Sequence, residues 1–349
     1  MKIALLGDTH FGCRKGSDIF DEYFERCFSE FIFPLMKEHK IFIVKQLGDL
    51  FDDRKAVSTK SITESKRYFF DVMRDNDIQL YTLLGNHDIF YRESLSVASQ
   101  REFLSAYKNV TIIDAPHEYD YGVSKIGMMP WICEENKQAS MEFLQNTGSN
   151  IIIGHFEISG FQMYKGVRAK DGLSPKIFER FRRVWSGHYH TRSNSDNISY
   201  LGTPYELTWQ DCDDPRGIHI YDTVKDTLEF FENPIKLFRK IEYQDFISDD
   251  VSLYNKCFVK VYVLEKTDQV KFEKYINSLY DVGAHEVIII EDLSEFKETS
   301  VIDDGKEVNI EDTMDIVKRY INSIETDKDK DKIYQYMQTL YLDSINNQT

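Results

Sequence analysis

One pattern occurs five times in the sequence: a strand-like apolar run ends at a glycine, and polar residues follow the glycine. The five segments are LLGDTH (5–10), QLGDLF (46–51), LLGNHD (83–88), IIGHF (152–156) and WSGHYH (185–190). Helical patterns alternate with apolar runs up to about residue 235, which predicts an α/β domain with an at least partly parallel sheet. Because the carboxyl ends of parallel strands share one edge, the polar residues should converge on a single crevice.

The polar residues of this pattern have the chemistry of metal ligands. Seven of them offer oxygen or nitrogen donors: Asp8, His10, Asp49, Asn86, His155, His188 and His190. Seven donors are too many for one catalytic ion, but they suit two divalent ions about 3.5 to 4 Å apart, as in phosphatases and nucleases. Imidazole, carboxylate and amide donors without thiolate suit Mn, Fe, Zn or Co. Since only two donors are carboxylates, the site would keep a positive charge and attract a phosphate.

Each motif alone also has an ordinary structural explanation. A glycine and aspartate after a strand usually form a turn, and a single buried histidine is usually a core residue. However, five of the nine histidines lie in the five segments. The other four, His39, His117, His219 and His285, lie elsewhere and keep the structural interpretation.

The rest of the chain is organised differently. We predict a large α/β domain over residues 1–238, a small α/β domain over 239–305 and a helical tail over 306–349. One apolar stripe of the tail has helical spacing and consists of Ile333, Tyr336, Met337, Leu340 and Tyr341. This stripe either docks a partner protein or packs against its own domain.

In their order along the chain, the motifs resemble those of the calcineurin-like metallophosphoesterase superfamily. They are DxH at Asp8 and His10, GD at Asp49, GNHD at 85–88, GH at His155 and GHxH at 187–190. Within it, the segments GDLFDDRK and YLGTPYELTW, the small domain and the tail resemble the SbcD-like DNA repair nucleases, above all the nuclease subunits of T-even-type phages. The resemblance implies two packed sheets flanked by helices, a small α/β cap that orients DNA, and a C-terminal helical pair.

The same resemblance implies a role for each site residue. One metal ion would be held by Asp8, His10, Asp49 and His190, and the other by Asp49, Asn86, His155 and His188, so that Asp49 bridges them. His87 would contact the scissile phosphate and protonate the leaving oxygen, and Asp88 would orient His87. Some relatives carry a second active-site histidine three residues after the bridging aspartate, where this chain has Asp52.

The implied function is a DNA nuclease that uses two divalent metal ions, Mn²⁺ in the first place and Mg²⁺ as the alternative. The resemblance implies 3′ to 5′ exonuclease activity on duplex ends and endonuclease activity on single strands, in recombination and double-strand-break repair. It also implies a homodimer within a heterotetramer, bound to an SMC-like ABC ATPase through the tail.

Three alternatives remain open. A phosphatase or small-molecule phosphodiesterase would share every metal ligand, and a non-catalytic scaffold for the ATPase would tolerate lost ligands. The residues Asp52, Asp53 and Arg54 also resemble the GDxxDRG motif of serine/threonine protein phosphatases, but the spacing is shifted by one and the final glycine is missing.

Charge along the chain bears on the substrate. The net charge of −16 argues against a general binder of polyanions. Residues 165–183 are basic, however, and contain Lys165, Arg168, Lys170, Lys176, Arg180, Arg182 and Arg183. Since His155 and His188 flank this segment, it can border the crevice and neutralise DNA phosphates. The alternative is the solvated face of a helix around PKIFERFRR (175–183).

The sequence also predicts where the protein acts. Its five cysteines are scattered and lack CxxC spacing, so a disulfide framework is not expected. No apolar run approaches the roughly 18 residues of a membrane helix. The N-terminal apolar run is cut off by Asp8 and does not resemble a signal peptide. A cytoplasmic location is expected, which is the host-cell cytoplasm for a phage-encoded chain.

Overall fold

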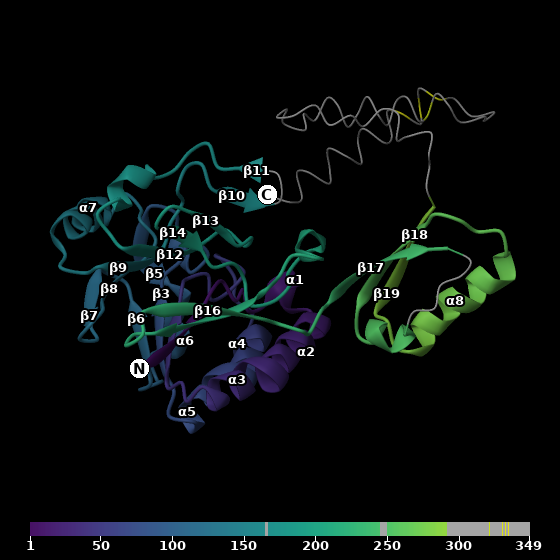
Figure 1. Ribbon diagram of the computed structural model, residues 1–349, viewed down its shortest axis with the longest axis horizontal. Helices are drawn as coiled ribbons and strands as arrows, with labels where there is room; N and C mark the ends of the chain where they lie inside the picture. The colour runs from purple at the N-terminus through teal and green to yellow at the C-terminus, as the bar shows by residue number, and fades with distance from the viewer. Residues whose placement is uncertain are drawn as a thin grey trace. The chain divides into compact units, whose positions relative to one another are not determined.

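The structure, a computed structural model, describes residues 1–164, 167–244 and 250–291, together with Ile321, Lys330, Lys332 and Tyr334 (Figure 1). The chain divides into two compact units, Met1–Glu291 and Asp292–Thr349, and nearly all of the second lies outside the described residues. The division into domains at 238/239 and 305/306 therefore remains a prediction, as does the C-terminal helical pair. Among the described residues, no helix has the length and apolar character needed to cross a membrane.

Two six-stranded sheets form the centre of the first unit. The first has the order β16 (Thr227–Glu232), β15 (Gly217–Asp222), β1 (Lys2–Leu6), β2 (Ile43–Gln46), β3 (Gln79–Leu83) and β6 (Val110–Ile113). The second has the order β13 (Ser193–Ser195), β14 (Ile198–Tyr200), β12 (Arg183–Gly187), β9 (Ile151–His155), β8 (Lys125–Met129) and β7 (His117–Asp120). Pairing is parallel from β1 to β6 and from β14 to β8, and antiparallel at the other edges.

Successive side chains of strand β1 point to opposite faces of the sheet and pack into two different hydrophobic cores. Ile3 and Leu5 belong to the core between the sheets, which also contains Trp185 of β12. Ala4 and Leu6 belong to the core beneath the helices of the first sheet. Because both faces of β1 are buried, its sequence is a continuous apolar run.

Helices cover the outer face of each sheet (Figure 1). Those beside the first sheet are α1 (Cys13–Gly16), α2 (Asp18–Arg26), α3 (Phe33–Glu38), α4 (Thr59–Ser65) and α5 (Asp71–Asp75), with π-helical turns at Cys27–Ile32 and Lys66–Phe70. Their buried aromatic residues, such as Phe24 and Phe28, fill the helix-side core of that sheet. On the second sheet, α7 (Lys137–Asn146) packs through Leu144. The predicted α/β class with two packed sheets flanked by helices is confirmed.

The first unit also contains shorter elements between the strands of the two sheets. They are the hairpin β4 (Ile89–Tyr91) and β5 (Ser94–Ala98), the helix α6 (Ser99–Leu104), the hairpin β10 (Gln162–Tyr164) and β11 (Val167–Arg168), and 3-10 turns at Pro175–Phe178 and Trp209–Asp211. In the segment PKIFERFRR, for which a solvated helix was the alternative to DNA contact, only a 3-10 turn forms before β12 begins at Arg183.

A small β-α-β unit follows β16 along the chain, as predicted for this part of the chain. It contains β17 (Phe238–Tyr243), a 3-10 turn at Val251–Tyr254, β18 (Phe258–Val263), α8 (Gln269–Asp281) and β19 (Glu286–Glu291). The three strands are parallel, and α8 buries Phe272, Ile276 and Leu279 against them.

Candidate metal centre

The carboxyl ends of the parallel strands bring the seven expected ligands together. Asp8 and His10 follow β1, Asp49 follows β2, Asn86 follows β3, His155 ends β9, and His188 and His190 follow β12. The two sheets meet at this edge, so residues up to 182 positions apart in the sequence become neighbours. The convergence predicted from the strand-glycine pattern is present in the structure.

Close approach of the strand ends requires glycine. Gly48 has φ of +95°, and a Cβ atom there would lie 2.5 Å from Nδ1 of His155. A Cβ atom at Gly187 would collide with the Asp8 carboxylate. The polar residues also adopt unusual backbone conformations, since φ is 46° at His10, 52° at Asp49 and 86° at His188. Positive φ at non-glycine residues costs on the order of 1 to 3 kcal/mol each and concentrates at functional sites.

One group of ligand atoms comes from Asp8, His10 and His190. Their donor atoms all lie within 4.8 Å of one another. Nε2 of His10 is 3.1 Å from Nε2 of His190, and the latter is 3.9 Å from Oδ2 of Asp8. Asp8 is itself oriented by the backbone N–H of His188, which donates to its Oδ2 at 2.9 Å.

A second group comes from Asp49, His155 and His188, with Asn86 beside them. Nε2 of His155 lies 3.3 Å from Oδ2 of Asp49 and 2.9 Å from Oδ1 of Asn86. The same amide oxygen lies 3.0 Å from Nδ1 of His188. Oδ2 of Asp49 is also 4.0 Å from Nε2 of His10, so one carboxylate oxygen faces both groups.

In His155 and His10, a contact made by the Nδ1 atom fixes which ring nitrogen faces the centre. Nδ1 of His155 donates to the carbonyl oxygen of Leu47 at 2.7 Å, and Nδ1 of His10 lies 3.1 Å from Oδ1 of Asp52. In both rings Nε2 is left for the centre. Metal-binding histidines are commonly held this way, by a carbonyl or carboxylate on the other nitrogen.

Burial and neighbouring charges shift the pKa values of three histidines of the site in different directions. Burial opposes the charged form of His155, but the Asp49 and Asp8 carboxylates raise its pKa to about 9. Burial likewise opposes charge on His10, yet Asp52, Asp49 and Asp8 raise its pKa to about 9. Burial and the charge of His155 lower the pKa of His188 to about 3. Metal binding at such histidines releases protons, because an imidazole nitrogen must be deprotonated to bind a metal ion.

The donor set fits divalent metal ions. It consists of imidazole nitrogens, carboxylates and one amide oxygen, and it excludes thiolate, which matches borderline ions such as Mn²⁺ and Zn²⁺ better than Cu⁺. The five cysteines, Cys13, Cys27, Cys133, Cys212 and Cys257, are all buried.

Comparison with known proteins supports this interpretation of the site. The family model described as Calcineurin-like phosphoesterase matches residues 1–192, more than half of the chain. The chain belongs to the calcineurin-like phosphoesterase family. Its match to a protein named exonuclease subunit 1 of Enterobacteria phage T4 has 32% identity and covers 99% of each chain. The resemblance inferred from the motifs is confirmed.

Two solved structures are weakly similar. A hypothetical protein from Thermus thermophilus has a TM-score of 0.37 and 11% identity, over 67% of this chain and 100% of the other. A protein of unknown function from Aquifex aeolicus has a TM-score of 0.25 and 13% identity, over 52% of this chain and 93% of the other.

Within this phosphoesterase site, His87 lies beside the first group of ligands. Its ring centroid is 5.1 Å from that of His10, and its backbone N–H donates to Oδ1 of Asp49 at 2.8 Å. Nδ1 of His87 donates to the carbonyl oxygen of Asp52 at 2.6 Å. This contact leaves Nε2 of His87 without an assigned partner among the described residues.

Asp88 was expected to orient His87, but its carboxylate binds backbone N–H groups instead. Its carboxylate accepts hydrogen bonds from the backbone N–H groups of Leu50 at 3.0 Å, Phe51 at 3.3 Å and Gly85 at 2.8 Å. Asp88 therefore joins the loop after β3 to the loop after β2. The contact that orients His87 comes from the Asp52 backbone, which the sequence motif did not indicate.

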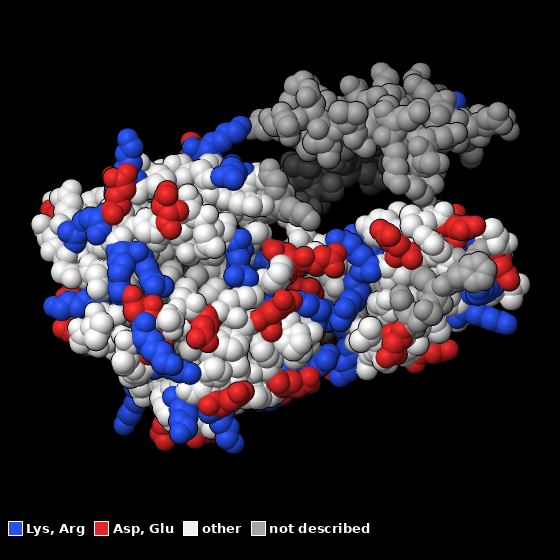
Figure 2. Space-filling model, viewed as in Figure 1, with Lys and Arg blue, Asp and Glu red and all other residues white. Residues whose placement is uncertain are grey.

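The expected DNA-binding residues differ in their contacts. Lys165 lies outside the described residues, whereas Arg168, Lys170, Lys176 and Arg180 are exposed, and Arg168 donates to the carbonyl oxygen of Gly160 at 2.9 Å. Arg180 donates to the carbonyl oxygens of Gln145 and Thr147, and Arg182 and Arg183 form ion pairs with Asp226. Figure 2 shows basic and acidic side chains interspersed over the visible face rather than separated into one basic surface.

The expected partner-binding residues of the tail, Ile333, Tyr336, Met337, Leu340 and Tyr341, all lie outside the described residues. The structure adds one residue that the motif search missed, Trp131. Its ring centroid is 5.2 Å from that of His188 and 6.0 Å from that of His155. Trp131 follows β8 as the ligands follow their strands, and this position is the signal that could have found it.

Proposed function

We propose that this phosphoesterase is a DNA nuclease that uses two divalent metal ions, Mn²⁺ in the first place and Mg²⁺ as the alternative. The observation that carries the proposal is the geometry of Asp49, whose Oδ2 faces His155 at 3.3 Å and His10 at 4.0 Å. A carboxylate between two ligand groups is the arrangement of a bridging ligand. The full-length similarity to an exonuclease subunit supports DNA as the substrate.

The residues of the two groups would hold one ion each. Asp8, His10 and His190 would form the first site, and Asn86, His155 and His188 the second, with Asp49 shared. Bound in pairs, such ions stabilise the attacking and leaving oxygens of an in-line displacement at phosphorus. The protein's own part is to fix the ligand rings through Leu47 and Asp52.

His87 is the proposed proton donor to the leaving oxygen. With Nδ1 bound to the Asp52 carbonyl, the proton available for transfer is on Nε2. The backbone bond from His87 to Asp49 fixes the distance between this ring and the proposed bridging carboxylate. His87 thereby assists bond cleavage without being a metal ligand.

The proposed substrate range and partner rest on the resemblance to SbcD-like nucleases and on the similarity to the phage T4 exonuclease subunit. We propose 3′ to 5′ exonuclease activity on duplex ends and endonuclease activity on single strands, in recombination and double-strand-break repair in the host cytoplasm. The word subunit in the relative's name supports a larger complex. We propose that the complex contains a homodimer of this chain and an SMC-like ABC ATPase bound through the C-terminal residues.

The test is a nuclease assay on end-labelled duplex and single-stranded DNA with Mn²⁺, Mg²⁺ or a chelator, with and without the ATPase. We expect shortening from the 3′ ends in Mn²⁺ and no cleavage with the chelator. A phosphatase or small-molecule phosphodiesterase remains the second candidate, because it would use the same ligands. Hydrolysis of p-nitrophenyl phosphate with no cleavage of either DNA, even with the ATPase present, would establish that alternative.

A further inference from the structure

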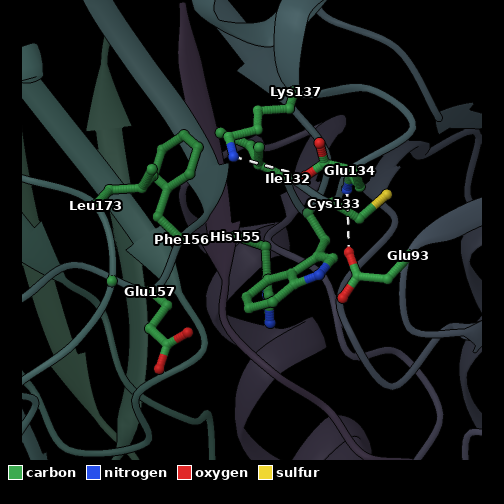
Figure 3. Close-up of a pocket in the computed structure, with 11 residues that line it drawn as sticks. Glu93, Ile132, Cys133, Glu134, Lys137, His155, Phe156, Glu157 and Leu173 are labelled. Atoms are coloured by element: carbon green, nitrogen blue, oxygen red, sulfur yellow. Dashed lines mark hydrogen bonds and ion pairs between the residues drawn. The ribbon is translucent and has the colours of Figure 1, made fainter.

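A cavity of about 230 Å³ adjoins the candidate metal centre (Figure 3). Its lining residues come from four segments and include Glu93, Trp131, Ile132, His155, Glu157 and Leu173. His155 belongs both to this lining and to the second ligand group, so the cavity begins where that group ends. The cavity is smaller than the roughly 300 to 1,000 Å³ typical of pockets for drug-sized ligands, and it suits one planar ring system.

The aromatic wall of the cavity is held firmly in place. The backbone N–H of Trp131 donates to the carbonyl oxygen of Leu84 at 2.7 Å, and the carbonyl oxygen of Trp131 accepts from Asn136 at 2.9 Å. Asn136 also accepts from the backbone N–H of Cys133 at 2.8 Å. The loop that carries Trp131 is thus fixed by three hydrogen bonds, and the indole ring itself lies against the rings of His188 and His155.

The charge of the lining determines what kind of group can enter. Glu93, Glu134 and Glu157 contribute three carboxylates and Lys137 a single cation, which pairs with Glu134 at 3.5 Å. Glu93 accepts from the backbone N–H of Glu134 at 3.1 Å, and Figure 3 shows the Glu157 carboxylate apart from these contacts. An acidic lining repels phosphate, so the phosphate belongs at the metal centre. The cavity favours a neutral ring that donates hydrogen bonds.

We propose that this cavity binds the unstacked nucleobase next to the scissile phosphate, and this inference rests on the proposed nuclease function. The base stacks on Trp131, as bases do on aromatic side chains in single-strand binding proteins. Its amino group donates to Glu157, as the cytosine amino group does to carboxylates elsewhere. Cytosine, adenine and guanine carry such an exocyclic amino group, whereas the only donor of thymine, its N3–H, lies between two carbonyl oxygens that the carboxylate repels, so the cavity discriminates against thymine.

Calorimetric titration of the Mn²⁺-loaded protein with dCMP and TMP tests the cavity directly. We expect dCMP to bind about ten-fold more tightly than TMP, and Trp131→Ala to weaken dCMP binding about ten-fold. Glu157→Gln should bind dCMP and TMP with similar affinity. Phe42→Ala is the matched control, because Phe42 is 58% exposed and lines a different cavity.

Equal affinity of the wild type for the two nucleotides, or unchanged dCMP binding in Trp131→Ala, would overturn the inference. Should Trp131→Ala fail to fold, Glu157→Gln decides alone, since retained discrimination there would also overturn it. DNA cleavage by the wild type separates the two proposals. Selective dCMP binding without DNA cleavage contradicts the nuclease function alone, whereas DNA cleavage with equal nucleotide affinities contradicts only the cavity's assignment.

Discussion

At the scale of single residues, Asp49 and His87 should have separable effects. Asp49→Ala is expected to abolish hydrolysis and release both metal ions, because its Oδ2 faces both ligand groups. His87→Ala should keep both ions and slow turnover by about 100-fold to 10,000-fold, the usual loss for general acid–base catalysis. Metal content of the purified variants by mass spectrometry, with turnover measured in parallel, distinguishes them. Full metal occupancy in Asp49→Ala would contradict the bridging assignment.

Asp52 offers a second residue-scale prediction. Its carboxylate lies 3.1 Å from Nδ1 of His10 and should strengthen His10 as a ligand. Asp52→Asn is therefore expected to weaken Mn²⁺ binding by about 10-fold to 100-fold in a calorimetric titration. Asp53→Asn is the matched control, since Asp53 is exposed and accepts from the nearby backbone N–H groups of Lys55 and Ala56. Equal Mn²⁺ affinity of the two variants would show that Asp52 does not support His10.

At the scale of elements, the β10–β11 hairpin is the best remaining candidate for DNA contact. Replacing Arg168 and Lys170 with alanine should weaken DNA binding and reduce its salt dependence by about 0.9 unit of slope for each lost phosphate contact. The matched control replaces Arg182 and Arg183, whose ion pairs with Asp226 occupy them within the protein. If the salt dependence of DNA binding changes in the control but not in the hairpin variant, the DNA contact lies in the segment before β12 instead.

Strand β2 carries a buried lysine that should make stability depend on pH. Lys45 is 0% exposed and lies 4.4 Å and 4.1 Å from the ring centroids of Tyr81 and Tyr119. Burial lowers its pKa to about 7, whereas the unfolded chain has a pKa of about 10.4. Between these values the unfolded state binds the additional proton, so the free energy of unfolding should rise with pH from about 7 to 10 and lose this dependence below 7.

Lys45→Met tests this expectation by urea unfolding at several pH values. The variant should be more stable at pH 7 by on the order of 3 kcal/mol, less than the full pKa shift implies because the tyrosine rings favour a cation. Its pH dependence between 7 and 10 should be flatter than that of the wild type. Lys37→Met is the control, because Lys37 is exposed, and it should leave the pH dependence of the free energy of unfolding unchanged. A destabilised Lys45→Met variant would mean that the ammonium group is held in its charged form.

At the scale of the whole molecule, the second compact unit, Asp292–Thr349, is the proposed docking element. Deleting residues 311–349 should leave the melting temperature and basal hydrolysis nearly unchanged but abolish co-purification with the ATPase, because helix-in-groove anchors carry such affinity. A control with Gln335 and Gln338 replaced by alanine should still bind the ATPase. If the stripe instead packs on its own domain, the deletion should cost about 2 kcal/mol for each buried Leu or Met. A much lower melting temperature with ATPase binding retained would reject docking.

The sequence by itself was sufficient for the family, the α/β class and the seven candidate ligands that converge at the sheet edge. These depend on local patterns, because a ligand that directly follows a strand is carried to the sheet edge wherever the strand lies. It was insufficient for the segment before β12, where a solvated helix around PKIFERFRR remained one of two interpretations. There the tertiary structure prevailed, since Arg183 begins a strand that pairs with β9 and Arg182 turns to Asp226.

Only the tertiary structure decided which residues support the site residues. Asp88 bonds the backbone after β2, the Asp52 carbonyl binds His87, and Trp131 stands beside His188, although no motif links these pairs. Such contacts join positions 35 to 57 residues apart and depend on which strands are neighbours and how their loops turn. Sequence spacing determines where a side chain leaves a strand, but the side chain's partners are determined by packing in three dimensions.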